Sequence, residues 1–189
     1  MSGPRSKCEI LQFPVGDQRH AKETSPVVIP SRVLTTVLFT DIVGSTERLA
    51  QLGDDSWRRL LDEHDRLAYG FVERHLGRVI KTTGDGILAI FDAPGCAIMC
   101  ATGLSSFAAD IGLRLRAGLH TGEVELRGDD IVGLTVNAAA RILGEAAPGE
   151  ILVSRVVTEL VAGAGVRFSR RGQRNLRGLP GRWFLFAAE

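Results

Sequence analysis

Apolar and polar positions along the chain follow two different periods, which separate the expected strands from the expected helices. Residues 33–39 (VLTTVLF) are apolar and rich in β-branched side chains, and a proline and an aspartate bound them, so they predict a buried strand. From residue 47 to residue 71, apolar side chains recur near the helical period, with an interruption at 53–54. The chain therefore predicts a strand followed by a long helical region.

The segments that follow also show strand patterns and helix patterns in turn. Two short strands, 78–83 and 87–91, are joined by the turn Thr83-Gly84-Asp85-Gly86, which is typical of a hairpin. Further expected elements are helices at 96–109, 136–143 and 156–161 and strands at 113–119, 123–126, 151–153, 166–168 and 183–186. This order predicts an α+β fold: a ferredoxin-like βαββαβ core with a mostly antiparallel sheet, helices packed on it, and appended C-terminal strands.

The chain divides into a short N-terminal segment and one domain. Residues 1–32 combine prolines with scattered charges and show no sustained period, so we expect a poorly ordered tail. Residues 33–189 suffice for one domain with a single core. No stretch reaches the ~18 uninterrupted apolar residues of a membrane span, and none resembles a signal peptide, so we expect a cytoplasmic protein.

Composition gives no reason to expect nucleic acid or a membrane as a partner. Lys and Arg number 23 against 22 Asp and Glu, so the net charge of +1 creates little long-range field. A local basic run is explained by a solvated sheet edge, because nucleic-acid binding would need more interleaved aromatic residues; it comprises Arg167, Arg170, Arg171, Arg174, Arg177 and Arg182. The three cysteines argue against a disulfide framework, and the four histidines show no metal-ligand spacing.

The first cluster with chemical potential is FTDIVGST at residues 39–46. Asp41 stands at the end of the expected strand, and a Gly-Ser-Thr turn opens the helix. A carboxylate there suits a hard cation, and the free N–H groups at a helix start suit phosphate oxygens. Gly44 lets the backbone come close to a ligand. A capped helix after an ordinary strand-end aspartate explains the same residues.

The second cluster is KTTGDG at residues 81–86, which places Asp85 at the tip of a tight hairpin. If that tip lies beside the first strand, Asp85 is close to Asp41, and two such carboxylates repel unless cations bridge them. Two metal ions ~3.5–4 Å apart form the usual clamp for in-line displacement at phosphorus. Taken alone, the segment is also a plain Asp-Gly turn, and only the pairing with Asp41 favours the metal site.

The third cluster is DIVGLTVNAAAR at residues 130–141. Asn137 and Arg141 are four positions apart on an expected helix, so they lie on one face, one turn apart. A forked cation suits a crowded phosphate in its transition state, and an amide suits a ribose oxygen. A solvated helix face would account for an isolated pair of this kind.

Together the three clusters resemble the class III adenylate and guanylate cyclases, particularly the small bacterial ones. The strand-end FTDIVGST, the hairpin KTTGDG and the helix DIVGLTVNAAAR occur in the order and spacing of that family. The resemblance covers about residues 33–186. It implies that Asp41, Asp85 and Ile42 hold two Mg²⁺ or Mn²⁺ ions, since both sites offer oxygen ligands only.

The resemblance also implies which residues contact the substrate. Asn137 would orient the ribose, and Arg141 would stabilise charge on the transferring phosphoryl group. Lys81 and Asp130 would read the purine. The triphosphate would contact the loop residues Ile42, Val43, Gly44, Ser45 and Thr46, and also Arg177, which stands where relatives often have lysine.

The choice of base follows from the chemistry of the two purine-reading residues. Lys81 only donates hydrogen bonds and an ionised Asp130 only accepts them, which suits the ring nitrogen and exocyclic amine of adenine. Guanine presents the reverse pattern, and the resulting mismatch can reject it by up to about 10⁴-fold. The sequence therefore predicts an adenylate cyclase that converts ATP into cyclic AMP and pyrophosphate, with the ribose 3′-hydroxyl attacking the α-phosphorus.

The family builds each active site across a dimer interface, with the metal-binding carboxylates from one subunit and the remaining groups from the other. Because this chain carries both sets, the resemblance implies a homodimer with two equivalent sites. A guanylate cyclase, a catalytically silent cyclase-like module that binds nucleotide or signals by contact, and another enzyme with a related palm-like core are the alternatives. The first would need a different pair at 81 and 130, and the last would lack the Asn137/Arg141 pair.

Overall fold

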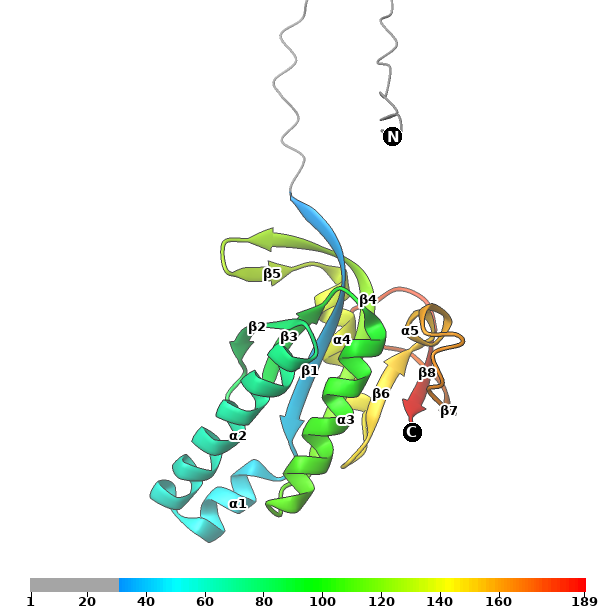
Figure 1. Ribbon diagram of the computed structural model, residues 1–189. Helices are drawn as coiled ribbons and strands as arrows, with labels where there is room; N and C mark the ends of the chain where they lie inside the picture. Colours follow the sequence, from blue (N-terminus) through cyan, green and yellow to red (C-terminus); the bar gives the residue numbers. More distant parts are fainter. Residues whose placement is uncertain (1–30) are drawn as a thin grey trace, which may run out of the picture.

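The computed structural model describes residues 31–189, which form one sheet with helices on both faces (Figure 1). Most of the tail expected at 1–32 lies outside the described residues, and Arg32 already belongs to the first strand. The strands are β1 Arg32–Ile42, β2 Gly77–Thr82, β3 Ile87–Phe91, β4 Leu115–Arg127, β5 Asp130–Val132, β6 Ile151–Ser154, β7 Phe168–Arg174 and β8 Trp183–Ala188. The helices are α1 Ser45–Leu52, α2 Asp54–Arg74, α3 Pro94–Asp110, α4 Leu134–Glu145 and α5 Arg155–Leu160.

The sheet confirms the α+β prediction. Its strand order is β2-β3-β1-β4-β6-β8-β7, with β5 paired to the far end of β4. Every neighbouring pair is antiparallel except β4 with β6, which run parallel. The βαββαβ core, with strands β1 to β4, and the appended C-terminal strands β6, β7 and β8 are therefore present as expected.

Side chains alternate between two cores because successive strand residues point to opposite faces. Leu38 of β1 lies in the larger core with buried residues of α2 and α3, such as Ala68 and Leu104. Its neighbour Val37 packs on the other face with Ala139 of α4. Helices α2 and α3 therefore cover one face of the sheet, and α4 lies against the other.

Two glycines in β4 bring α4 close to the sheet. A Cβ added at Gly118 would lie 2.2 Å from the backbone nitrogen of Leu143, and one at Gly122 would lie 2.5 Å from the hydroxyl of Thr135. Only glycine allows this approach without moving the helix. The Thr135 hydroxyl also donates to the carbonyl of Glu123, at 2.7 Å, and so ties the start of α4 to β4.

The region expected as two strands, 113–119 and 123–126, is one continuous strand, so that prediction was wrong. β4 pairs with β1 from Ile42↔Leu115 to Arg32↔Glu125, which keeps the intervening residues in the ladder. Strand β5 was not predicted because it has three residues. Strand β7 was predicted only at its first position, because most of its residues are arginine, glycine and other polar types.

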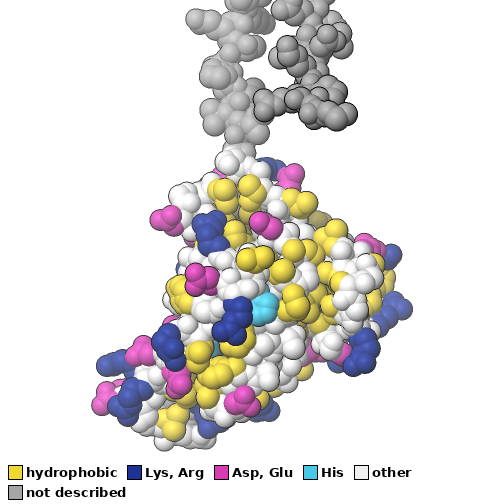
Figure 2. All heavy atoms as spheres, viewed as in Figure 1, with side chains coloured by type: hydrophobic (Ala, Val, Ile, Leu, Met, Phe, Trp, Pro, Cys, Tyr) yellow, Lys and Arg dark blue, Asp and Glu magenta, His cyan; other side chains and the backbone are white. Residues whose placement is uncertain are grey.

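Charges on the surface are mixed. Figure 2 shows basic and acidic side chains interspersed over the face viewed there, with no continuous basic surface on its described part. Among residues 31–189, no helix is both long and apolar enough to cross a bilayer.

Candidate active site

The end of β1 and the β2–β3 hairpin are fastened together by backbone hydrogen bonds. The Ile42 N–H donates to the carbonyl of Asp85, at 3.2 Å, and the Thr83 N–H donates to the carbonyl of Gly86, at 2.8 Å. The Ile87 N–H donates instead to the side-chain oxygen of Thr40, at 3.1 Å. The bonds of Ile42 and Ile87 hold the hairpin tip against the end of β1, and the bond of Thr83 closes the hairpin itself.

Gly86 is required for this close approach. A Cβ at that position would lie 1.9 Å from the carbonyl oxygen of Thr40 and 3.0 Å from the Cα of Asp41. Any other residue would therefore force the hairpin away from β1. The second glycine of the TGDG turn thus positions the aspartate that precedes it.

Asp41 and Asp85 are brought together as the sequence predicts. Burial is the largest cause that raises the pKa of the Asp41 carboxyl above its usual value; a hydrogen bond from Arg116 opposes this shift, and the neighbouring Asp85 carboxyl adds to it. A bridging cation would relieve the repulsion between the two groups. Within residues 31–189 no three His, Cys, Asp or Glu side chains form a metal cluster, so the remaining ligands would have to come from main-chain oxygens, water or a bound ligand.

Arg116 is a member of the site that sequence reasoning missed. It lies directly opposite Asp41 in the β1–β4 ladder, with its Nε 2.7 Å and its terminal nitrogen 2.5 Å from one Asp41 carboxylate oxygen. Residues 113–119 (LRLRAGL) alternate apolar and basic side chains, which indicates a half-exposed strand with basic side chains on one face. Only the strand register shows which of these arginines faces Asp41.

A cavity of about 450 Å³ opens between the two carboxylates and the start of α1. It is lined by Asp41, Ile42, Val43, Gly44, Ser45, Thr46, Glu47, Asp85 and Arg116. Gly44 adopts the left-handed conformation, with φ of 72°, and leads into the first turn of α1. The first N–H groups of a helix have no partner within it, so this wall of the cavity suits an anion.

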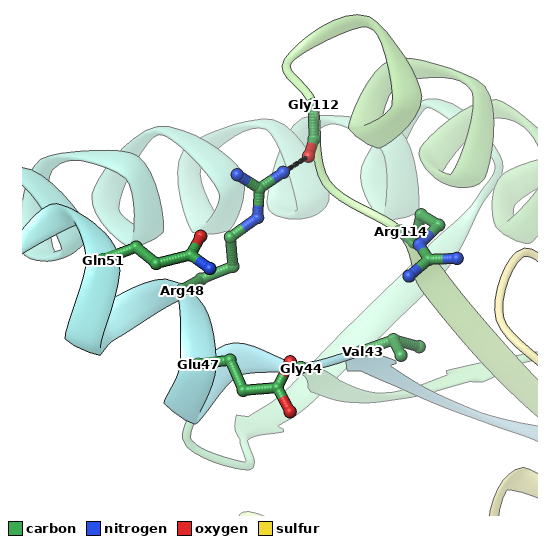
Figure 3. Close-up of a pocket in the computed structure, with 7 residues that line it drawn as sticks. All are labelled: Val43, Gly44, Glu47, Arg48, Gln51, Gly112 and Arg114. Carbon is green, nitrogen blue, oxygen red and sulfur yellow. Dashed lines mark hydrogen bonds between the residues drawn. The ribbon is translucent and has the colours of Figure 1, made fainter.

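A second cavity of about 350 Å³ adjoins the same loop (Figure 3). Val43, Gly44 and Glu47 border both cavities. Arg48 reaches across the second one and donates to the carbonyl of Gly112, and Arg114 lines it from the strand side. Val43 and Gly44 of the substrate loop predicted at 42–46 therefore border two cavities.

The two predicted purine-reading residues form an ion pair. The Lys81 ammonium lies 2.6 Å from the Asp130 carboxylate, and both side chains are about half exposed, at 49% and 45%. The other carboxylate oxygen of Asp130 accepts from the Ile131 N–H, at 2.8 Å. The hydrogen bonds from Lys81 and from Ile131 lower the pKa of Asp130, so it is an ionised acceptor at neutral pH.

The predicted pair on α4 lies on the exposed face of that helix. Asn137 and Arg141 are both exposed, whereas Ala138, Ala139 and Ile142 between and beside them are buried against the sheet. Within the described chain, neither side chain has a hydrogen bond or an ion pair to another residue. They are free to meet a ligand or another molecule.

One chain does not bring all the predicted residues to one cavity. Of the side chains expected around the nucleotide, Lys81, Asp130, Asn137 and Arg141 do not line the cavity between Asp41 and Asp85. Arg177 is exposed in the loop between β7 and β8, where the buried Leu176 anchors it. The predicted site residues thus fall into a carboxylate group and several groups elsewhere on the surface.

The described histidines lie away from the carboxylate pair. His120 is hydrogen-bonded to Ser154 at 2.7 Å, and burial lowers its pKa to about 4, so its imidazole is neutral at neutral pH. His75 is hydrogen-bonded to the carbonyl of Phe71, at 2.8 Å. The buried His64 makes a contact of 3.1 Å with Asp65, and His20 lies outside the described residues.

The fold and the two converging carboxylates define a class of domain: an α+β sheet with an acidic site beside the start of a helix. The model of the adenylate and guanylate cyclase catalytic domain matches residues 30–187, and the chain belongs to this family. This confirms the resemblance inferred from the three clusters.

Individual relatives agree with this assignment. The chain is 31% identical over 183 residues to a pH-sensitive adenylate cyclase from Mycobacterium tuberculosis, covering 89% of this chain and 46% of that protein. It is 31% identical over 140 residues to a putative adenylate cyclase from Rhizobium meliloti, covering 70% of this chain and 24% of the relative. The chain therefore spans less than half the length of either.

Solved structures share the fold. The adenylyl cyclase CyaB from P. aeruginosa superposes with a TM-score of 0.79 at 21% identity, covering 86% of this chain and 96% of that one. An adenylate/guanylate cyclase/hydrolase from Silicibacter pomeroyi superposes with a TM-score of 0.76 at 25% identity, covering 85% and 98%.

Proposed function

We propose that this chain is an adenylate cyclase, which converts ATP into 3′,5′-cyclic AMP and pyrophosphate. The observation that carries the proposal is the convergence of Asp41 and Asp85 on a cavity walled by the start of α1. Carboxylates beside an anion-binding wall suit a cation-bound triphosphate. Membership of the cyclase family supplies the reaction class.

The residues fit the metal ions that the proposal requires. Asp41 and Asp85, with Ile42 beside them, would hold two Mg²⁺ or Mn²⁺ ions, because hard cations prefer oxygen ligands. When bound, these ions favour ionisation of the ribose 3′-hydroxyl and neutralise charge on the departing pyrophosphate. The pKa of the Asp41 carboxyl is raised mainly by burial and further by the neighbouring Asp85 carboxyl.

The remaining residues bind and orient the nucleotide. The 3′-oxygen forms a bond to the α-phosphorus while the bond to the β-phosphate oxygen breaks, and the hydroxyl proton leaves to solvent. Arg141 stabilises the charge on the transferring phosphoryl group, and Asn137 orients the ribose. Residues 42–46 and Arg177 contact the triphosphate.

The ion pair between Lys81 and Asp130 supports adenine as the base. It presents a donor and an acceptor side by side, which matches the ring nitrogen and the amine of adenine and opposes the corresponding groups of guanine. Because the pair is already formed, little side-chain ordering remains to be done on binding.

A homodimer with two composite sites would complete the active site. The carboxylate cavity of one chain lacks the α4 pair and the purine-reading pair, and these side chains are exposed on the same chain. A second copy, related by a two-fold axis, would supply them and receive the same set in return.

The first experiment measures product formation by the purified chain. With Mn²⁺, cyclic AMP and pyrophosphate should form in equal amounts from ATP, and GTP should give little cyclic GMP. Asp85→Asn should abolish the reaction while leaving the thermal unfolding midpoint nearly unchanged. Cyclic GMP as the main product would indicate a guanylate cyclase, and nucleotide binding without turnover would indicate a silent module.

Replacing Gly86 tests whether the position of the two carboxylates matters, because both carboxylates remain in the variant. The Gly86→Ala variant pushes the hairpin tip away from Thr40, and a displacement of about 1 Å at a reacting centre costs on the order of 10² in rate. Steady-state assays of cyclic AMP formation would measure the loss. Gly70→Ala in α2, where a Cβ meets nothing within 4 Å, is the matched control and should keep full activity. Equal activity of the two variants would contradict the role given to the close approach.

A further inference from the structure

Another cavity, of about 280 Å³, lies between the end of β6, the start of α5 and the start of β8. Its lining includes His120, Ser154, Arg155, Arg182, Trp183 and Phe184. No residue of this lining borders the cavity between Asp41 and Asp85. The cavity is therefore a separate place on the chain, and the proposed function makes no use of it.

Three rings form much of the wall of this cavity. His120 and Trp183 pack edge to face, with ring centroids 5.1 Å apart, and Phe184 follows Trp183 along β8. The indole N–H of Trp183 donates to the carbonyl of Pro180, at 3.2 Å, which fixes the orientation of that ring. A flat aromatic ligand suits such a wall, because ring pairs stabilise a complex beyond the area that they bury.

His120 presents an uncharged ring to the cavity. Its Nδ1 lies 2.7 Å from the hydroxyl oxygen of Ser154, a residue that is only 2% exposed. Burial lowers the pKa of His120 to about 4, so the imidazole is neutral at neutral pH. The charge of the cavity is therefore set by its other residues.

Those other residues leave one positive charge in excess. Arg155 is paired with Glu159, which also lines the cavity, at 2.7 Å between the arginine Nε and the carboxylate. Arg182 donates to the side-chain oxygen of Gln173 at 3.5 Å, a long hydrogen bond to a neutral group. A guanidinium held this weakly is available to a carboxylate, which it can bind through two parallel hydrogen bonds.

We propose that this cavity binds a small aromatic carboxylate, with the ring against Trp183 and Phe184 and the carboxylate on Arg182. Ligand cavities usually measure roughly 300–1,000 Å³, so a volume of about 280 Å³ suits a single ring rather than a nucleotide. The inference goes beyond the proposed function and does not rest on it.

Benzoate is the probe, titrated into the full ¹⁵N-labelled chain and followed through the indole N–H signals in nuclear magnetic resonance spectra. The chain has two tryptophans. The signal of Trp183 should shift until it saturates, whereas the signal of Trp57, which is buried in the core, should stay in place. Trp183→Phe assigns the two signals by removing one of them.

Two analogues test which groups of the ligand are recognised. Benzamide has the same ring without the charge and should bind about tenfold more weakly, because a hydrogen bond between two charged groups is stronger than one to a neutral amide. Cyclohexanecarboxylate keeps the charge without the aromatic ring and should bind several-fold more weakly.

A variant tests the arginine directly. Arg182→Gln should weaken benzoate binding by about tenfold and leave benzamide binding nearly unchanged. Arg127→Gln is the matched control, since Arg127 is an exposed arginine that pairs with Glu125 and does not line the cavity. Thermal unfolding of each variant checks the fold.

Three results would overturn the inference: a Trp183 signal that does not shift, equal affinities of the unchanged chain for benzoate and benzamide, or equal benzoate affinities of the Arg182→Gln and Arg127→Gln variants. A shift that disappears as the chain concentration rises would mean that a second copy covers the cavity, and it would overturn the inference as well. No measurement here depends on turnover. A chain that binds benzoate but makes no cyclic AMP would refute the proposed function alone, and an active cyclase that does not bind benzoate would refute this site alone.

Discussion

A mixture of two inactive variants, Asp41→Ala and Arg141→Ala, is expected to regain cyclase activity. Each variant alone should lose activity by about 10³-fold, because each lacks one group that stabilises the charge of the transition state. In a mixed dimer, one site inherits both defects and the other inherits none. Random pairing of equal amounts should restore about a quarter of the normal activity, since half of the dimers are mixed and each holds one intact site.

The control is a mixture in which both defects fall on the same half of the site. Asp41→Ala mixed with Asp85→Ala should show no recovery, because every site in the mixed dimer then lacks one carboxylate. Analytical ultracentrifugation would confirm that mixed dimers form. If dimers form and the Asp41→Ala and Arg141→Ala pair stays inactive, the composite site is wrong.

Exchanging the two purine-reading charges is expected to change the nucleotide used. The double variant Lys81→Glu with Asp130→Lys keeps an ion pair at the position where 2.6 Å now separates the two groups, but it reverses donor and acceptor. Guanine then finds an acceptor for its ring N–H and a donor for its carbonyl. The ratio of kcat/KM for ATP to that for GTP should fall by about 10³-fold or more, since unpaired buried polar groups are the strong route to rejection.

The single variants distinguish a change in base recognition from a non-specific loss of activity. Lys81→Glu alone places two carboxylates side by side and should weaken both substrates, and Asp130→Lys alone places two ammonium groups together with the same result. Recovery of GTP turnover in the double variant, measured as cyclic GMP, would show that the pair acts as a unit. A double variant that still prefers ATP would mean that other groups read the base.

Local sequence was enough for most elements of this fold. β-Branched runs, the Thr-Gly-Asp-Gly turn and helical spacing predicted the core strands and helices, because each of these depends on neighbouring residues alone. Strand β7 gave little signal because most of its residues are polar or glycine, and β5 because it has only three residues; each becomes a strand by pairing, with β8 and β4 respectively. The continuity of β4 likewise depends on its full-length partner, β1.

The site residues also differ in whether the sequence alone could identify them. Motif order identified Asp41 and Asp85, and the structure brings them together because Gly86 admits the hairpin against Thr40. Arg116 carried no motif signal, and its contact with Asp41 follows from a cross-strand register between residues 75 positions apart. Such a contact is invisible to any local pattern.

The order of the three motifs determined the family, because the spacing of functional groups along strands and helices survives in the sequence itself. The tertiary structure alone decided that one chain separates the carboxylate cavity from the exposed Asn137 and Arg141, and that Arg116 pairs with Asp41. Both depend on how distant segments pack and pair. Packing and register are set by the whole sheet, so no short segment of the chain contains them.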